Sequence, residues 1–544
     1  MTQGEDGARF DYIIVGAGSA GCVLADRLSR NPSNRVLLIE AGGRDKDPMI
    51  KIPKGFAKTL ANPDYTWYFP TEIFGPHDTS EVWMRGKTLG GSSAVNGMVY
   101  NRGTQPDWDS LEALGNPGWG WAEIVDAYKH IENNELGATS TRGAGGPVTI
   151  SSDQRRDDSL CEEYIESAVK LGMKRVDDYN EADGERVGYT MANIKNGRRV
   201  SAAHAFLHPA EKRANLTVAI NSTATRVLFD GDRASGVEVR TGDQTVQYHA
   251  SRDIVLSLGS VQTPKLLQLS GIGPSDVLKS VGIDVRVDSP NVGGHMREHR
   301  CVVAQFRLNA DLGYNRKLAT KTRQNLEGVR YLATRRGPLS APCFDVVGFV
   351  KTDPGLDRPD GQILMGPYSV SSHSSNVEME REPGIQCLGF ILRTDSEGYM
   401  QIRSTDPDAP IAIEPQYYTT PHDQKVAAGL FNKMRELFTQ EPIARRVAYE
   451  TSPGKDVASD QQIVDHFVDA GWTGFHAIGT CAMGPDDNSV IDSELRVRGV
   501  QNLRVMDASV LPIMIAGNLN APMMAMAWRF SDMLLGDAAS PSSS

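Results

Sequence analysis

The feature that most constrains the fold is the stretch FDYIIVGAGSAGCVLADRLSR, residues 10–30. Its run Tyr12–Val15 is short, continuous and apolar, which predicts a buried strand. Apolar residues then recur at helical spacing after Gly21. Gly16, Gly18 and Gly21 form a G-x-G-x-x-G pattern between strand and helix. This arrangement predicts a dinucleotide site, because the glycines permit a tight turn, a close approach to a pyrophosphate and packing of the helix on the strand.

A carboxylate stands where such a site needs one. Residues 35–39 read RVLLI, which predicts a second buried strand, and Glu40 follows it, nineteen residues after Gly21. An acid at this place accepts hydrogen bonds from a ribose and repels a 2′-phosphate. NADP is therefore disfavoured, while NAD and FAD both remain open at this point.

The remaining composition narrows the function class. A chain of 544 residues predicts two domains or more. The net charge of −11 provides no basic surface for nucleic acid. The N-terminus MTQGEDGARF lacks the apolar core of a secretory signal, and no apolar run is long enough to span a bilayer. Six cysteines lack C-x-x-C spacing, which predicts free thiols and a cytoplasmic location, and the histidines show no metal-ligand spacing, so no metal site is expected.

The texture of the chain predicts a discontinuous organisation. Strand–turn–helix patterns occur near the N-terminus, at about 217–273 and at 503–530, and residues 217–240 are expected to form antiparallel strands around an Asp-Gly turn. The region from 294 to 460 instead alternates strands and turns without phosphate loops. We expect a cofactor domain made of 1–155, 215–293 and 461–540. Residues 156–214 and 294–460 would form a second, β-rich domain that covers the reactive end of the cofactor.

Two further motifs point to one family. Residues 85–103 read RGKTLGGSSAVNGMVYNRG, and residues 259–273 read GSVQTPKLLQLSGIG. Together with the N-terminal fingerprint and a C-terminal block, they resemble the two signatures of the glucose–methanol–choline oxidoreductases over nearly the whole chain. The resemblance implies an α/β (α+β) fold, a Rossmann-like FAD domain interrupted in sequence, and a substrate domain built on an antiparallel sheet. It also implies FAD bound without a covalent link, because Val95 stands where relatives with attached flavin carry a histidine.

The fingerprint and the resemblance together assign residues to FAD. They are Gly16, Gly18, Ser19, Ala20, Gly21, Glu40, Ala41, Gly86, Leu89, Gly91, Ser92, Asn96, Gly97, Met98, Val99, Val227, Asp507, Ala508, Asn518, Pro522 and Met523.

The resemblance also implies a catalytic pair. His476 lies in an H-x-x-G-T-x-x-M-G setting that matches the family's catalytic histidine, and its partner is expected at Asn520, with Asn518 as the neighbouring alternative and a flavin contact. A neutral histidine can take the hydroxyl proton of an alcohol while an asparagine amide holds its oxygen. His299, in an Glu–His pair, is interpreted as structural.

Gly474 and Phe475 are assigned to the substrate pocket, where many relatives carry a bulkier residue in place of the glycine. Gly474 would then open space for a bulky or flat alcohol, or else only relieve backbone strain. The leading hypothesis is FAD-dependent oxidation of a primary, aromatic or furanic alcohol, with O₂ or another electron acceptor. A choline- or polyether-type alcohol dehydrogenase and a hydroxynitrile lyase are the alternatives; a non-catalytic FAD protein is disfavoured because both His476 and Asn520 are present.

Overall fold

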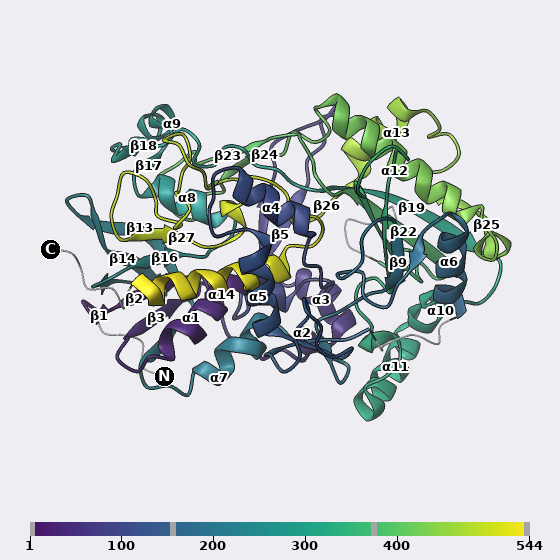
Figure 1. Cartoon of the computed structure of the whole chain (residues 1–544), viewed down its shortest axis with the longest axis horizontal. Coiled ribbons are helices and arrows are strands. Elements are labelled where there is room, and N and C mark those ends of the chain that lie inside the picture. Colours follow the sequence, from purple (N-terminus) through teal and green to yellow (C-terminus); the bar gives the residue numbers. More distant parts are fainter. Residues whose placement is uncertain (1–5, 153–158, 372–377, 538–544) are drawn as a thin grey trace.

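The computed structural model describes residues 6–152, 159–371 and 378–537. The ends of the expected cofactor segments at 1–5, 153–155 and 538–540 lie outside these ranges. In Figure 1, the N-terminal and C-terminal parts of the chain meet in one half of the molecule, and α6 (Ser159–Lys170), α12 (Pro421–Phe438) and α13 (Asp460–Ala470) lie in the other half.

The first half is built on a five-stranded parallel sheet. Its order is β12 (Leu216–Ala219), β3 (Val36–Ile39), β2 (Tyr12–Val15), β16 (Ile254–Leu256) and β27 (Leu503–Val505). All residues of β2 and β3 are buried, as their continuous apolar sequences predict. Helices α1 (Ser19–Ser29) and α14 (Asn520–Asp537) run side by side against this sheet (Figure 1). The carboxyl ends of β2, β16 and β27 share one edge, where ligands bind in open parallel sheets.

The stretch 217–240 differs in part from the expectation. β13 (Ser222–Asp230) and β14 (Arg233–Thr241) form the predicted antiparallel hairpin. β12, in contrast, pairs in parallel with β3, Leu216 opposite Val36, and closes that edge of the parallel sheet. The physical reason is that the hydrogen-bonding edge of the buried strand β3 needs a partner in the core.

The second half is a larger sheet. Its order is β25 (Val447–Ser452), β19 (Arg300–Leu308), β22 (Gly384–Ile391), β21 (Gly361–Gly366), β20 (Val346–Val350), β9 (Arg186–Tyr189) and β8 (Lys174–Arg175), antiparallel except between β8 and β9. In strand β22, side chains of one face point to a cavity and those of the other face point to helix α12. Leu388 and Phe390 line a cavity, whereas a Cβ on the intervening Gly389 would meet Leu430 and Met434 of α12.

The fold class is therefore confirmed, while the division into two domains stays a prediction. The strands of the parallel sheet lie within residues 12–39, 216–256 and 503–505, and those of the larger sheet lie within residues 174–189 and 300–473. β26 (Trp472–Thr473) falls in the segment expected in the cofactor domain, but it pairs with the start of β19 in the larger sheet. α13, just before it, packs on α12. β26 completes the edge of β19 there, and this pairing brings the following residues, 474–476, to the junction between the two sheets.

Candidate active site

A single cavity of about 2140 Å³ runs between the two sheets. It is larger than the roughly 300–1,000 Å³ of a pocket for a drug-sized ligand, so it has room for a dinucleotide together with a substrate. Most of the predicted residues lie on its wall: Gly16, Gly18, Ser19, Ala20, Glu40, Ala41, Gly86, Gly91, Ser92, Asn96, Gly97, Met98, Val99, Asp507, Ala508, Met523, Gly474, Phe475, His476, Asn518 and Asn520.

Four predicted cofactor residues do not lie on this wall: Gly21, Leu89, Val227 and Pro522. Leu89 and Pro522 are buried in the protein interior. Val227 donates its backbone N–H to Ser270 Oγ at 2.9 Å and so faces α8 (Gln262–Leu269). Earlier residues of β13, Thr223 and Ala224, take its place on the wall, which no sequence motif indicated.

The fingerprint glycines have separate structural roles. Gly16 adopts φ of +103°, and a Cβ there would lie 2.4 Å from the Ser257 carbonyl oxygen. A Cβ on Gly21 would lie 1.9 Å from the Gly16 oxygen, so this glycine lets α1 pack on the turn and does not face a ligand. At Gly18 the nearest atom would be 3.9 Å away, which leaves its face open to the cavity. Gly91 of the motif at residues 85–103 packs directly on Gly18, so this motif touches the fingerprint turn.

The polar groups at this end of the cavity fit FAD. Glu40 accepts backbone N–H bonds from Ala17 at 2.9 Å and Gly42 at 2.8 Å, and burial raises its pKa to about 7. Its carboxyl group lines the cavity and can accept from ribose hydroxyls. Ser257 Oγ, on the same wall, is buried without a hydrogen-bond partner in the protein. A buried hydroxyl of this kind is expected to bind a ligand group or water.

The motif at residues 259–273 connects two strands of the parallel sheet. The Asp507 carboxylate follows β27 and accepts from Thr263 Oγ1 at 2.6 Å and from the backbone N–H groups of Gly259 at 3.0 Å and Ser509 at 2.9 Å. Burial is the main cause that raises the Asp507 pKa. The threonine and the first glycine of GSVQT thus connect the turn after β16 to the end of β27.

At the other end of the cavity, His476 contacts Asn518 rather than Asn520. Asn518 donates from Nδ2 to His476 Nε2 at 3.2 Å. Asn520 Oδ1 accepts instead from Ser19 Oγ at 2.7 Å, which ties the first residue of α14 to the first residue of α1. The turn before α14 points the two asparagines in different directions, so the neighbouring alternative, Asn518, is the residue that is hydrogen-bonded to His476. The catalytic role expected for Asn520 stays a prediction.

A chain of amides fixes the orientation of Asn518. The Gly103 backbone N–H donates to Asn101 Oδ1 at 3.1 Å, and Asn101 Nδ2 donates to Gln362 Oε1 at 3.2 Å. Gln362 Nε2 then donates to Asn518 Oδ1 at 3.1 Å. Since a backbone N–H can only donate, each amide in the chain has one orientation, and Asn518 must present its N–H groups to His476. Asn101 lies within the motif at residues 85–103 but was given no role there, and Gln362 lies in no recognised motif.

The orientation of Asn518 sets the protonation of His476. Its Nε2 accepts a hydrogen bond and so carries no proton, which leaves the proton of the neutral ring on Nδ1. That atom lies 2.9 Å from His299 Nδ1, and His299 Nε2 lies 3.4 Å from the Leu392 carbonyl oxygen. His299, interpreted from sequence as structural, is therefore the hydrogen-bond acceptor that holds the His476 tautomer.

Burial keeps both imidazoles neutral. It lowers the pKa of His476 well below 6.5, with smaller contributions from His299 and Arg85, and it lowers the pKa of His299 to about 4. Glu298 accepts the backbone N–H groups of His476 at 2.7 Å and His299 at 2.8 Å, and Arg85 lies 3.5 Å from its other oxygen. Burial raises the Glu298 pKa to about 7. Glu298 thus holds the backbone of both histidines in place.

Gly474 does not open space for a substrate. A Cβ there would lie 2.8 Å from His299 Cβ and 3.1 Å from His476 Nδ1. The expectation of extra room beside the flavin is corrected: the glycine lets the two histidines approach each other. Phe475, half-exposed on the cavity wall, adopts φ of +60°, an unusual backbone conformation for a residue with a side chain.

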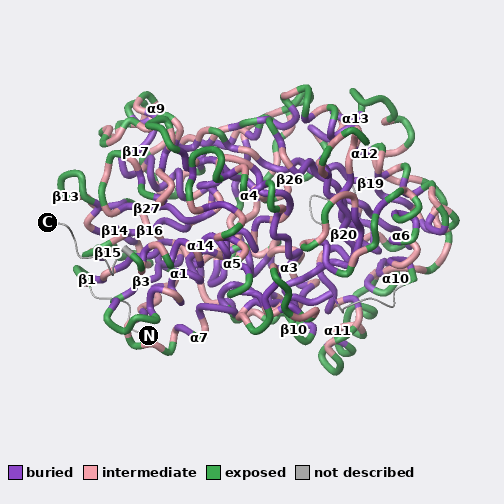
Figure 2. The backbone as a smooth tube through the Cα atoms, viewed as in Figure 1, coloured by how far each residue is buried: buried purple, intermediate pink, exposed green. Residues whose placement is uncertain are grey.

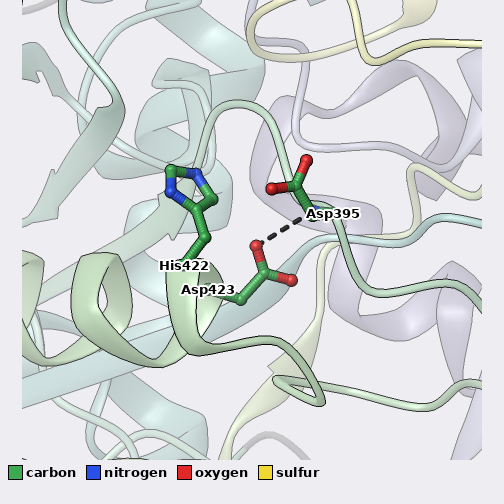
Figure 3. A group of neighbouring side chains, drawn as sticks. All are labelled: Asp395, His422 and Asp423. Carbon is green, nitrogen blue, oxygen red and sulfur yellow. Dashed lines mark hydrogen bonds between the residues drawn. The ribbon is translucent and has the colours of Figure 1, made fainter.

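One group of potential metal ligands exists among the described residues: Asp395, His422 and Asp423 (Figure 3). Asp423 already accepts from Thr394 Oγ1 at 2.5 Å and from the backbone N–H groups of Asp395 at 2.9 Å and Ser396 at 2.8 Å. The carboxylate therefore fastens the start of α12 to the loop after β22, and we assign no ion to it.

Comparisons with known proteins agree with this architecture. Family models described as GMC oxidoreductase match residues 10–301 and 394–527. The chain is 35% identical to "Alcohol dehydrogenase [acceptor]" of Pseudomonas putida, over 97% of this chain and 96% of that protein. It is also 35% identical to "Choline dehydrogenase, mitochondrial" of Homo sapiens, over 98% and 91%.

Solved structures give the same picture. Pyridoxine 4-oxidase from Mesorbium loti superposes with a TM-score of 0.87 at 29% identity, over 97% of this chain and 99% of that one.

Among the described residues, no helix has both the length and the apolar character required to cross a bilayer. The hydroxynitrile lyase alternative finds no support in these comparisons, whereas an FAD-dependent enzyme that acts on alcohols does. The chain belongs to the GMC oxidoreductase family.

Proposed function

We propose that this protein oxidises a primary alcohol to the aldehyde, with His476 as the base. The observation that carries the proposal is the unprotonated Nε2 of a neutral, half-buried His476, which lies on the cavity wall and is paired with an amide donor. The hydroxyl proton of the alcohol passes to His476 Nε2, and the Asn518 amide N–H holds the alcohol oxygen as negative charge develops there. Bound FAD would supply the acceptor for the hydride that leaves the carbinol carbon.

The other residues position this pair. Gln362 and Asn101 orient the Asn518 amide, and His299 keeps the His476 proton on Nδ1. Glu298 holds the backbone of both histidines. After proton transfer, His476 becomes an imidazolium that can donate from Nδ1 to His299. The buried setting disfavours that charge and therefore favours return of the proton once the aldehyde leaves.

A bulky, flat alcohol is the substrate class that we propose. Support comes from apolar and aromatic residues of the cavity wall, which include Phe344, Leu364, Leu388 and Phe390. The Phe390 ring centroid lies 5.6 Å from that of His476. The pyridoxine 4-oxidase relationship points the same way, since its name denotes an alcohol on an aromatic ring. None of the six cysteines, all of which lie in the described part of the chain, forms a disulfide, which supports the proposal of a reducing, cytoplasmic location.

A choline-type substrate is the second candidate, and the similarity to choline dehydrogenases is what favours it. The electron acceptor of either candidate is O₂ or another oxidant, and the same experiment identifies it. Anaerobic mixing of the FAD-loaded protein with aromatic, furanic and aliphatic alcohols and with choline, followed by flavin absorbance, distinguishes the candidates. We expect aromatic alcohols to bleach the flavin fast. Admission of air then identifies the acceptor: reoxidation with release of H₂O₂ indicates O₂, and the lack of it indicates another oxidant.

The His476→Ala variant is the matched control in this experiment. It should bind FAD normally and reduce it at least about 10²-fold more slowly, because the general base is lost. Near-normal bleaching by this variant would contradict the role of His476, and the absence of bleaching by every alcohol in the wild-type protein would contradict the function.

A further inference from the structure

Helix α11 (Lys321–Thr334) exposes apolar side chains that its neighbours do not cover. Figure 1 shows it projecting at the edge of the molecule, and Figure 2 shows its largely exposed surface. Leu326, Val329 and Leu332 are 65%, 66% and 65% exposed. Their spacing places them on one side of the helix. Tyr331 is the buried residue of α11, and it donates from its hydroxyl to the Gly197 carbonyl at 2.8 Å, so the apolar side lies opposite the residue that anchors the helix.

The same segment is basic within an acidic protein. Residues 315–336 contain seven Lys or Arg and one Glu, a net charge of +6, whereas the whole chain carries −11. On the helix, Lys321 lies on one flank of the apolar side, and Arg323 and Arg330 lie on the other. Arg330 is exposed and lies 3.6 Å from the half-buried Glu327, which offsets one of these charges.

The surface continues on the neighbouring hairpin. The turn at Gly197, which holds Tyr331, connects β10 (Ile194–Lys195) to β11 (Arg198–Arg199), and Lys195 and Arg198 are exposed. The outer surface of α11 and this hairpin thus combine an apolar stripe with basic residues. That composition is typical of helices that lie in the plane of a membrane interface.

The helix also borders the active-site cavity. Val329 and Leu332 line the cavity that reaches His476, and both are exposed to solvent at the same time. The apolar side of α11 is therefore continuous with the entrance for a substrate.

We propose that α11 docks on the surface of an anionic phospholipid bilayer, with Leu326, Val329 and Leu332 inserted at the boundary between headgroups and acyl chains. The basic flanks would contact lipid phosphates, and the cavity mouth would open toward the bilayer, from which an apolar alcohol could enter. Charge complementarity favours this occupant over a second copy of the chain, because a symmetric contact through α11 would place two segments of +6 against each other. The proposal does not depend on the identity of the reaction.

The experiment is flotation of the full-length, FAD-loaded protein with vesicles of phosphatidylglycerol mixed with phosphatidylcholine, beside vesicles of phosphatidylcholine alone. We expect binding to the anionic vesicles, weak binding to the neutral ones, and a loss of binding at high salt. The combined variant Lys321→Gln, Arg323→Gln, Arg330→Gln should lower the partition coefficient by about 10²-fold. Leu326→Ser with Val329→Ser should lower it by at least about 10-fold.

Ile73→Ser is the matched control, since Ile73 is an equally exposed apolar residue at 68% but belongs to the turn that Thr79 ties to Asp469 of α13. It should bind like the wild type. FAD content and melting temperature report that each variant is folded. The proposal is overturned if the wild type ignores anionic vesicles at low salt, or if Ile73→Ser loses as much binding as the α11 variants. It is also overturned if light scattering shows a dimer that Leu326→Ser dissociates, because α11 would then be a contact between copies.

Discussion

At the scale of single residues, the absence of a side chain at Gly474 lets His299 and His476 lie close together. A Cβ at this position would press on His299 and on the His476 ring, whose Nδ1 would lie 3.1 Å away. We expect Gly474→Ala to displace the His476 ring whatever the substrate. Since a displacement of about 1 Å can cost about 10²-fold, kcat/KM should fall by a similar factor for aromatic and small aliphatic alcohols alike. Steady-state kinetics with one alcohol of each class measures this, and a loss confined to the bulky alcohol would restore the idea of an opened pocket.

Substitutions of Asn518, before α14, and of Asn520, at its start, should have different effects. Asn518→Ala removes the donor to His476 Nε2 and should slow flavin reduction by about 10²–10³-fold with FAD still bound. Asn520→Ala instead removes the acceptor of the Ser19 hydroxyl and should mainly weaken FAD retention at the start of α1. Stopped-flow reduction and flavin content measure the two effects, and the opposite pattern would return the catalytic role to Asn520.

The pH dependence also belongs to this scale. Burial lowers the pKa of His476 well below 6.5, so the base stays neutral as the pH falls from 8 to 6. Protonation removes the base only below that shifted pKa. We therefore expect His476 itself to add no acidic limb to the kcat/KM profile over this range. Because the Glu298 pKa is about 7, a limb that Glu298 causes should disappear in Glu298→Gln. An acidic limb centred at or above pH 6.5 that persists in Glu298→Gln would show that the His476 pKa is not lowered, or that His476 is not the base.

At the scale of elements, the Asp507 carboxylate connects the end of β27 to the turn after β16 and to the start of α8. Thr263→Val keeps the shape of the side chain but leaves the buried Asp507 carboxylate without its 2.6 Å hydroxyl donor. Loss of a hydrogen bond to a charged group should lower the free energy of unfolding by about 1.5–3 kcal/mol. Thr263→Ser, which keeps the hydroxyl, is the control in urea unfolding. Equal stability of the two variants would mean that Asp507 does not depend on this bond.

At the scale of the whole molecule, the cavity lies between the two sheets, so FAD would join them. Addition of FAD to the flavin-free protein should stabilise the fold by about 2.7 kcal/mol at a hundredfold excess over Kd, measured as a shift of the urea midpoint. Val95 provides no nucleophile for attachment, so acid precipitation should release the flavin into the supernatant. Flavin that remains with the pellet would contradict noncovalent binding.

The sequence alone determined the features that depend on local backbone chemistry. The strand YIIV, the turn glycine Gly16 and Glu40 after the next strand lie within about thirty residues, and each follows from burial, turn geometry or hydrogen-bonding capacity. The resemblance of the motifs then indicated the family and FAD. Only the tertiary structure decided which asparagine meets His476, since Asn518 and Asn520 differ by two positions and packing of α14 against α1 sets their directions. The same holds for the amides that orient Asn518: Gln362 lies 156 positions from Asn518, and Asn101 lies 261 positions from Gln362. Contacts over such separations depend on how two sheets meet, and no local pattern records that geometry.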